Sequence, residues 1–231
     1  DVAPSRGLGD VYKRQIMHPY TIDTGVRKKV IIYIFIFSIV LSSVLTYFLE
    51  AGILSTKAWL QQFVWIDQVL KICDTVGVTT NFIGVPFLYG VIYWIFDKYL
   101  WKQKIFKRFL NVPDLNGYWE GKLTSLTYQT TMDMKLEVKQ QWSKINFYAT
   151  FPESTSSSNV ASIFIERDGK VTVGFGFINH SRELPQQYDG YNILEIDDDT
   201  HLFGRYFNNR DNSNIGHKGG NIGTFKLSKI N

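Results

Sequence analysis

Two long stretches without a charged side chain constrain the fold of this chain more than any other feature of its sequence. The first, VIIYIFIFSIVLSSVLTYFL, occupies residues 30–49. At a rise of 1.5 Å per residue, a helix of this length spans the roughly 30 Å hydrocarbon core of a bilayer. The second, residues 75–96, contains Gly84 and Pro86, which membrane helices tolerate. The two stretches therefore predict an N-terminal two-helix transmembrane hairpin.

The first stretch also has a feature of a cleaved signal peptide, because basic residues precede it. Its 20 residues exceed the usual apolar region of about 7–15 residues in a signal peptide, and no clear Ala-x-Ala site follows. An uncleaved helix is therefore expected, with residues 1–29 as a tail before it. Residues 1–16 have neither periodicity nor apolar density and are set aside as a candidate non-native leader, with Met17 as a sensible start.

Charge sets the expected orientation of the hairpin, because basic residues flank it on both outer sides and the loop of residues 50–74 is not enriched in them. By the positive-inside rule, both termini lie in the cytoplasm and the loop lies on the far side of the membrane, as in a multi-pass membrane protein. The flanking residues are Arg27, Lys28 and Lys29 before the first helix, and Lys98, Lys102, Lys104, Lys107 and Arg108 after the second.

The loop of residues 50–74 contains apolar residues at helical spacing, which predicts a short amphipathic helix. This helix either lies on the membrane surface or packs against the ends of the hairpin. The spaced residues are Trp59, Phe63, Ile66 and Leu70.

After Pro113-Asp114, short alternating runs bounded by turn residues replace the apolar stretches. Residues 97–112 are expected to be a basic juxtamembrane linker, and residues 113–231 a C-terminal, cytoplasmic all-β domain. About eight successive strands without crossover helices predict an eight-stranded antiparallel up-and-down β-barrel, which is either filled by side chains or holds one small ligand. The expected strands are Gly117–Ser125, Thr130–Gln140, Trp142–Phe151, Val160–Arg167, Lys170–Ile178, Tyr191–Asp197, Thr200–Asn208 and Gly223–Ser228.

The composition excludes several classes of protein. One cysteine, Cys73, rules out an internal disulfide framework and a multi-cysteine zinc site. Residues 111–231 carry 12 Lys and Arg against 14 Asp and Glu, so the predicted β-domain lacks the basic surface of a DNA- or RNA-coating protein. The sequence has no nucleophile elbow, phosphate loop or dinucleotide fingerprint. We therefore expect no enzymatic activity, no cofactor and no metal.

An anionic ligand in the barrel would need cations and aromatic rings near one mouth. Guanidinium groups form paired hydrogen bonds with phosphates, and aromatic rings stack on nucleobases. Each candidate also has a simpler explanation, as a solvated surface charge or a core aromatic residue. The candidate ligand-binding residues are Arg205, Arg210, Arg182, Tyr206, Trp119 and Lys218.

The order of these predicted segments, with Leu115-Asn116-Gly117-Tyr118-Trp119-Glu120-Gly121 at the first strand, resembles the SMODS-associated two-transmembrane, β-strand-rich effectors. These belong to bacterial cyclic-oligonucleotide-based antiphage signalling (CBASS), and the resemblance covers residues 17–231. It implies that the membrane is the bacterial inner membrane, with the loop of residues 50–74 in the periplasm. It also implies that the barrel binds a cyclic di- or oligonucleotide second messenger. It further implies that protomers then form a homo-oligomer and disrupt the inner membrane, so that the cell stops growing or dies before phage matures.

Two other hypotheses stay open at the level of the sequence. A membrane-anchored, lipocalin-like barrel that binds an apolar or lipid ligand explains the barrel equally well. A structural barrel that only mediates assembly would explain the acidic, motif-free surface.

Overall fold

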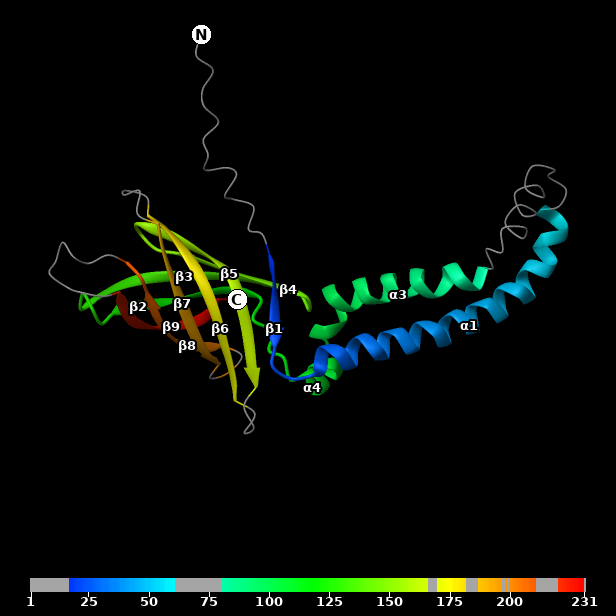
Figure 1. Ribbon diagram of the computed structural model, residues 1–231, viewed down its shortest axis with the longest axis horizontal. Helices are drawn as coiled ribbons and strands as arrows, with labels where there is room; N and C mark the ends of the chain where they lie inside the picture. The colour runs from blue at the N-terminus through cyan, green and yellow to red at the C-terminus, as the bar shows by residue number, and fades with distance from the viewer. Residues whose placement is uncertain are drawn as a thin grey trace, which may run out of the picture. The chain divides into compact units, whose positions relative to one another are not determined.

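The computed structural model describes residues 17–60, 80–165, 170–181, 187–196, 198, 200–210 and 220–230 (Figure 1). The chain divides into two compact units, which are described separately. Residues 25–100 form a helical unit, and residues 101–231 form a β-domain together with the segment before residue 25.

The helical unit consists of α1 (Val26–Leu60) and α3 (Thr80–Lys98), which lie side by side (Figure 1). Buried positions recur every four residues along α1, which places them on one face. They are small or apolar, and the Ser38 hydroxyl donates to the carbonyl of Ile34 at 2.7 Å. The rings of Phe35 and Tyr89 meet edge to face at 6.3 Å, so side chains of the two helices are in contact. The buried residues of α1 are Val30, Ile34, Ser38 and Ser42.

The predicted two-helix transmembrane hairpin was wrong. In the described part of the chain, one helical segment, Val26–Tyr47, has the length and apolar composition to cross a membrane. Helix α1 continues beyond the predicted end at residue 49 to Leu60, because a single charge such as Glu50 interrupts the hydropathy and not the helical backbone. In the second charge-free stretch the described helix, α3, runs from Thr80 past the predicted end at residue 96 to Lys98. Residues 61–79, with most of the predicted amphipathic helix, lie outside the described residues.

The described residues of the β-domain form one sheet of nine strands that closes on itself as a barrel, in the order β1-β4-β3-β2-β9-β8-β7-β6-β5 (Figure 1). Two short helical segments, η2 (Leu100–Lys102) and α4 (Lys104–Leu110), precede β2. The strands are β1 (His18–Ile22), β2 (Gly117–Ser125), β3 (Thr130–Gln140), β4 (Lys144–Thr150), β5 (Ser154–Ile165), β6 (Val171–Ser181), β7 (Gln187–Ile196), β8 (His201–Asn208) and β9 (Asn221–Ile230).

The prediction of eight antiparallel strands was also wrong, because β1 is a ninth strand that the sequence analysis assigned to the tail. It enters between β4 and β5, which pair with each other only at residues 148–150 and 155–157. Strand β1 pairs antiparallel with β4 at His18 and parallel with β5 up to Ile22. Since α1 follows β1 and α3 precedes β2, both ends of the helical unit connect to this one sheet.

Ser158 lies on β5 at the point where β1 enters the sheet. The pairing of β5 with β6 shifts its register between Ser158 and Val160. The Ser158 hydroxyl accepts a hydrogen bond from the backbone N–H of Phe147 at 2.9 Å, and its oxygen lies 2.7 Å from His18 Nε2. One side chain therefore ties together the three strands β1, β4 and β5.

The motif at the start of β2 has a structural role. The Trp119 side chain is buried, and its indole N–H donates to the carbonyl of Leu115 at 3.0 Å. Gly117 has a φ of +126°, which disfavours any residue with a side chain. A Cβ at Gly121 would overlap the backbone carbonyl of Lys226 on β9. The motif thus serves the close pairing of β2 with its neighbours.

Apolar side chains fill the interior of the sheet below the end where β2, β6 and β8 finish. The rings of Phe147 on β4 and Phe175 on β6 stack at 4.1 Å with an angle of 7° between their planes. Leu194 and Val173 beside them are completely buried. This packed layer forms the floor of the site described next.

Candidate functional site

The inward face of several strands changes from apolar to polar at one end of the sheet. On β6, Phe175 and Phe177 are followed two residues later by Asn179, and on β8 Tyr206 is followed by Asn208. Strands β6 and β8 both pair antiparallel with β7, which brings these two strand ends together. The buried polar residues at this end are Ser125, Ser156, Asn179, Asn192, Asn208 and Asn221.

These strand ends surround a pocket that encloses about 80 Å³. Its floor is apolar and includes Phe147 and Phe175, whereas its rim is polar and aromatic. This volume is far below the roughly 300–1,000 Å³ of most small-molecule sites, and holds only a few waters at about 30 Å³ each. The rim residues include Tyr128, Asn179, Tyr188, Tyr206, Asn208 and Arg210.

Hydrogen bonds fix the rim. The Ser125 hydroxyl donates to Asn221 Oδ1 at 2.8 Å and accepts from the backbone N–H of Tyr128 at 3.1 Å. Asn208 Oδ1 accepts from the backbone N–H groups of Arg210 at 3.2 Å and Asn221 at 3.3 Å. Hydrogen bonds within the protein therefore hold the side chains where β2 and β8 end and β9 begins.

Arg210 supplies positive charge to the rim. Its guanidinium carbon lies 5.5 Å from the ring centre of Tyr128 and 5.8 Å from that of Tyr188. Burial raises the pKa of Tyr188 and of Tyr206, and Arg210 opposes this rise at both. Both phenols are therefore protonated at neutral pH and can donate hydrogen bonds. The rim thus combines a cation, flat rings and hydroxyl donors.

Asn179 presents an acceptor without a partner among the described residues. The residue is 2 % exposed, and its Nδ2 donates to Ser154 Oγ at 3.3 Å. Its Oδ1 is buried and accepts no hydrogen bond from any residue that the structure describes. Because a buried unsatisfied polar atom costs about 1–3 kcal/mol, a bound molecule with an N–H or O–H group at this point would recover that cost.

The structure brings together two of the six residues predicted from the sequence. Tyr206 and Arg210 line the pocket. Arg205 is exposed on the outer face of β8, where it points away from the interior. Trp119 is buried six residues before Ser125 on β2, about 20 Å along the strand from the rim. Arg182 and Lys218 lie outside the described residues and stay predictions.

The site predicted from the sequence lacked the asparagines, Ser125 and two tyrosines of the rim. It consisted of cations and aromatic rings, because uncharged amides are not typical anion-binding groups. The usable signal was the inward face of β6, where Val173, Phe175 and Phe177 lead to Asn179 at the strand end. An asparagine in that position is a buried polar group that needs a partner.

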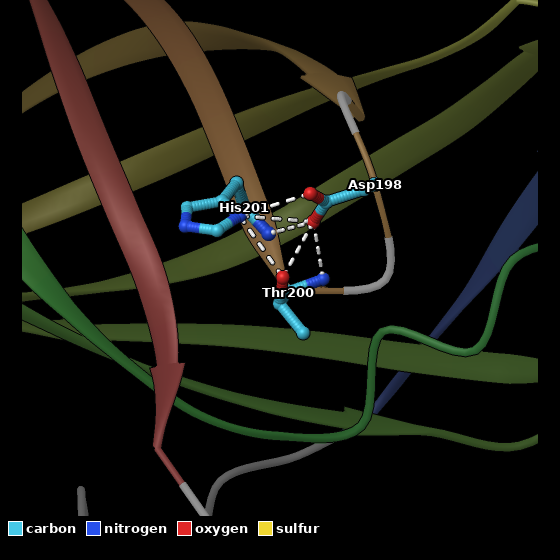
Figure 2. A network of polar contacts seen from close by, with 3 residues as sticks. All are labelled: Asp198, Thr200 and His201. Carbon is cyan, nitrogen blue, oxygen red and sulfur yellow. Dashed lines mark hydrogen bonds and ion pairs between the residues drawn. The ribbon is translucent and has the colours of Figure 1, made fainter.

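A second polar cluster lies in the connection between β7 and β8 (Figure 2). The Asp198 carboxylate accepts hydrogen bonds from the Thr200 hydroxyl at 2.7 Å and from the backbone N–H of Thr200 and of His201 at 2.6 Å each. His201 Nδ1 lies 3.0 Å from Asp198 Oδ2. These are the contacts of a tight turn, and the described residues contain no group of three or more His, Cys, Asp or Glu side chains suited to a metal ion.

This turn has a predictable pH dependence. The Thr200 hydroxyl, and after it His201, hold the pKa of Asp198 well below its usual value of about 3.9. The ionised Asp198 carboxylate therefore stabilises the folded protein above about pH 4, and this stabilisation is lost as the pH falls through the lowered pKa. At pH 6 we expect the wild type to melt at a higher temperature than Asp198→Asn. This difference should shrink as the pH is lowered below about 4. An advantage that is constant with pH would show that the charge of Asp198 does not stabilise the turn.

A closed sheet whose described rim carries amides, phenols and an arginine defines a class of domain, namely small β-domains with a polar pocket at one end of the sheet. Comparison with known proteins narrows this class. Residues 110–218 match the family described as Cap15, cyclic dinucleotide receptor domain. The resemblance to CBASS effectors expected from the sequence is thereby confirmed, and curated relatives carry the name CD-NTase-associated protein 15.

The relative from Yersinia aleksiciae is 27 % identical over 139 residues, which cover 56 % of this chain and 64 % of the relative. The relative from Staphylococcus schleiferi is 28 % identical over 137 residues, with 59 % and 66 % covered. The match thus spans just under two thirds of these relatives. The solved structure of EF1p2_mFAP2b bound to DFHBI has 14 % identity and a TM-score of 0.32 over 50 % of this chain and 94 % of that one, a similarity too low to bear on the fold.

Proposed function

We propose that the β-domain binds a cyclic dinucleotide at its polar rim, and that the chain is a membrane-anchored effector of CBASS antiphage defence without catalytic activity of its own. The observation that carries this proposal is Arg210, whose guanidinium lies beside the rings of Tyr128 and Tyr188 at the rim of the pocket. The match of residues 110–218 to a cyclic dinucleotide receptor domain supports it.

The groups of the rim suit the parts of such a ligand. Arg210 provides a guanidinium for a phosphate, which it can bind through two parallel hydrogen bonds. Tyr128 and Tyr188 offer ring faces to a nucleobase, and Asn179 Oδ1 offers an acceptor for a base N–H. Since the enclosed space is only about 80 Å³, part of the ligand remains outside the sheet, with its phosphates near Arg210.

A lipocalin-like carrier of an apolar ligand is the competing function, and the apolar floor with Phe147 and Phe175 is the feature that favours it. The size of the pocket and its polar rim speak against it, because an acyl chain needs a long apolar cavity. The experiment below therefore includes a fatty acid.

The helical unit supports the membrane part of the proposal. Outward-facing side chains of α1 are large, apolar and exposed, the reverse of a helix in a soluble protein. We propose that this segment anchors the chain in the bacterial inner membrane. Ligand binding then promotes association of protomers and disruption of the membrane, which requires that the ligand binds the associated state more tightly. The exposed residues include Ile31, Ile32, Phe35, Ile36, Phe37 and Val40.

The test is thermal melting of the full chain in detergent against a panel of cyclic di- and trinucleotides and a fatty acid. The full chain is needed because β1 lies outside residues 111–231. We expect one cyclic dinucleotide, at about 100 times its dissociation constant, to stabilise the protein by roughly 2.7 kcal/mol, which shifts the melt by several degrees. Stabilisation by the fatty acid alone would replace the proposal with the carrier function.

A further inference from the structure

Helix α4 (Lys104–Leu110) presents large apolar side chains to solvent. Ile105 is 72 % exposed and Phe109 is 77 % exposed. Because they are four residues apart, they share one face of the helix. Such exposure of two neighbouring apolar side chains marks an interaction surface more often than a single exposed residue does.

The other side of α4 is fixed to the β-domain, so the exposed face has a defined orientation. Leu110 is buried, and so are Trp101 before the helix and Val112 after it. Asn111 ends the helix in the left-handed conformation with a φ of 52°, and its backbone N–H donates to the carbonyl of Lys107 at 3.0 Å. The exposed apolar pair is therefore held outward by a capped and anchored helix.

Basic side chains surround the apolar pair. Lys104 and Arg108 are exposed and also four residues apart, and Lys107 lies beside them. Within the described residues, none of these three forms an ion pair. An apolar pair bordered by exposed cations is the pattern of a helix that lies in a membrane interface, and seven residues are too few to cross a bilayer.

We propose that α4 docks on the anionic surface of the membrane, with Ile105 and Phe109 at the boundary between headgroups and acyl chains, and with Lys104 and Arg108 on lipid phosphates. The positive charges of Lys104 and Arg108 favour an anionic membrane surface as the partner, because cations beside an apolar pair complement anionic lipids. The proposal goes beyond nucleotide binding and rests only on the anchoring of α1 in the bilayer. It means that the β-domain has a second, direct attachment to the lipid surface.

The test uses site-directed spin labels on the full chain in lipid nanodiscs loaded with one chain per disc, which excludes a second copy as the occupant. Cys73 is the only cysteine of the chain, so Cys73→Ser provides a cysteine-free background. Labels are placed through Ile105→Cys and Phe109→Cys, and the collision of each label with oxygen and with a water-soluble nickel complex is measured. In discs with anionic lipid we expect both labels about 5–10 Å deep, rich in oxygen collisions and protected from nickel.

Two control labels separate the possible failures. Phe37→Cys, on the exposed face of α1, reports whether the anchor is in lipid. Val160→Cys, an exposed apolar position on β5, reports the nickel accessibility of a β-domain surface that the proposal leaves in water. The nucleotide proposal is not involved, because no ligand is added.

Charge reversal tests the choice of occupant. Lys104→Glu with Arg108→Glu should restore nickel collisions at the label on residue 109 and leave the label on residue 37 unchanged. The matched control, Arg205→Glu with Lys226→Glu on the exposed face of β8 and β9, should change neither label. The proposal is overturned if residues 105 and 109 are as open to nickel as residue 160 while residue 37 is in lipid. It is also overturned if their protection is the same in zwitterionic discs and survives the charge reversal.

Discussion

Arg210→Glu is expected to abolish cyclic dinucleotide binding, whereas Arg205→Glu is expected to leave it unchanged. Arg210 lines the pocket between two tyrosine rings, and Arg205 is exposed on the outside of β8. Loss of a hydrogen bond to a charged group costs about 1.5–3 kcal/mol, which corresponds to roughly a 10- to 150-fold loss of affinity. The glutamate adds repulsion of the phosphates, so the loss should exceed this range.

Isothermal titration of the two full-length variants with the cyclic dinucleotide that stabilises the wild type measures this difference. The pair is well matched, because both changes reverse the same charge on or beside β8 and only one of the two positions faces the pocket. Arg210→Lys should bind with intermediate affinity, since it keeps the charge and loses the planar group that lies against the rings. Normal binding by Arg210→Glu would remove this residue from the site and with it the geometry proposed for the ligand.

Removal of β1 is expected to prevent stable folding of the β-domain. A chain of residues 101–231 lacks Tyr20 and Ile22, which are 3 % and 9 % exposed. It also lacks the backbone hydrogen bond from Asp23 to the Ile163 carbonyl. Each lost apolar side chain costs about 2–5 kcal/mol, and together they approach the 5–15 kcal/mol stability of a typical domain. A thermal melt of residues 101–231, monitored by circular dichroism, should show no cooperative unfolding transition.

The matched control joins residues 17–24 to residue 101 through a flexible linker, which should restore a cooperative melt. The same fusion with Tyr20→Asp and Ile22→Asp should fail to do so, because it keeps the length and removes the buried apolar side chains. If residues 101–231 alone melt at the same temperature as the intact fusion, then β1 contributes nothing to the closure of the sheet.

Local pattern predicted much of the β-domain. The bounds of β2 and β3 were predicted as the structure has them, Gly117–Ser125 and Thr130–Gln140. In β3, Met134, Leu136 and Val138 alternate with charged residues, and strict alternation defines both the strand and its buried face. Alternation is weaker at the first residues of β5 and β7, and there the observed strands begin several residues earlier than predicted.

Strand β1 could not be predicted in this way. It has five residues, too few to establish a period, and begins next to a segment without any pattern. Its partners lie far away in the chain: His18 contacts Ser158, 140 residues later. Only closure of the sheet creates the gap between β4 and β5 that these five residues fill.

The sequence by itself determined the segments, namely apolar helices before short alternating strands, because side-chain hydrophobicity at a fixed period is a local property. It also determined that an arginine and a tyrosine near the end of β8 were candidates for an anionic ligand. The tertiary structure decided that Arg210 and Tyr206 meet at a rim while Arg205 faces outward. Gly204 shows the reason: a side chain at this inward position of β8 would overlap the buried ring of Phe225 on the neighbouring strand β9. Which face of a strand is buried, and which strand ends converge, depends on partners distant in the chain.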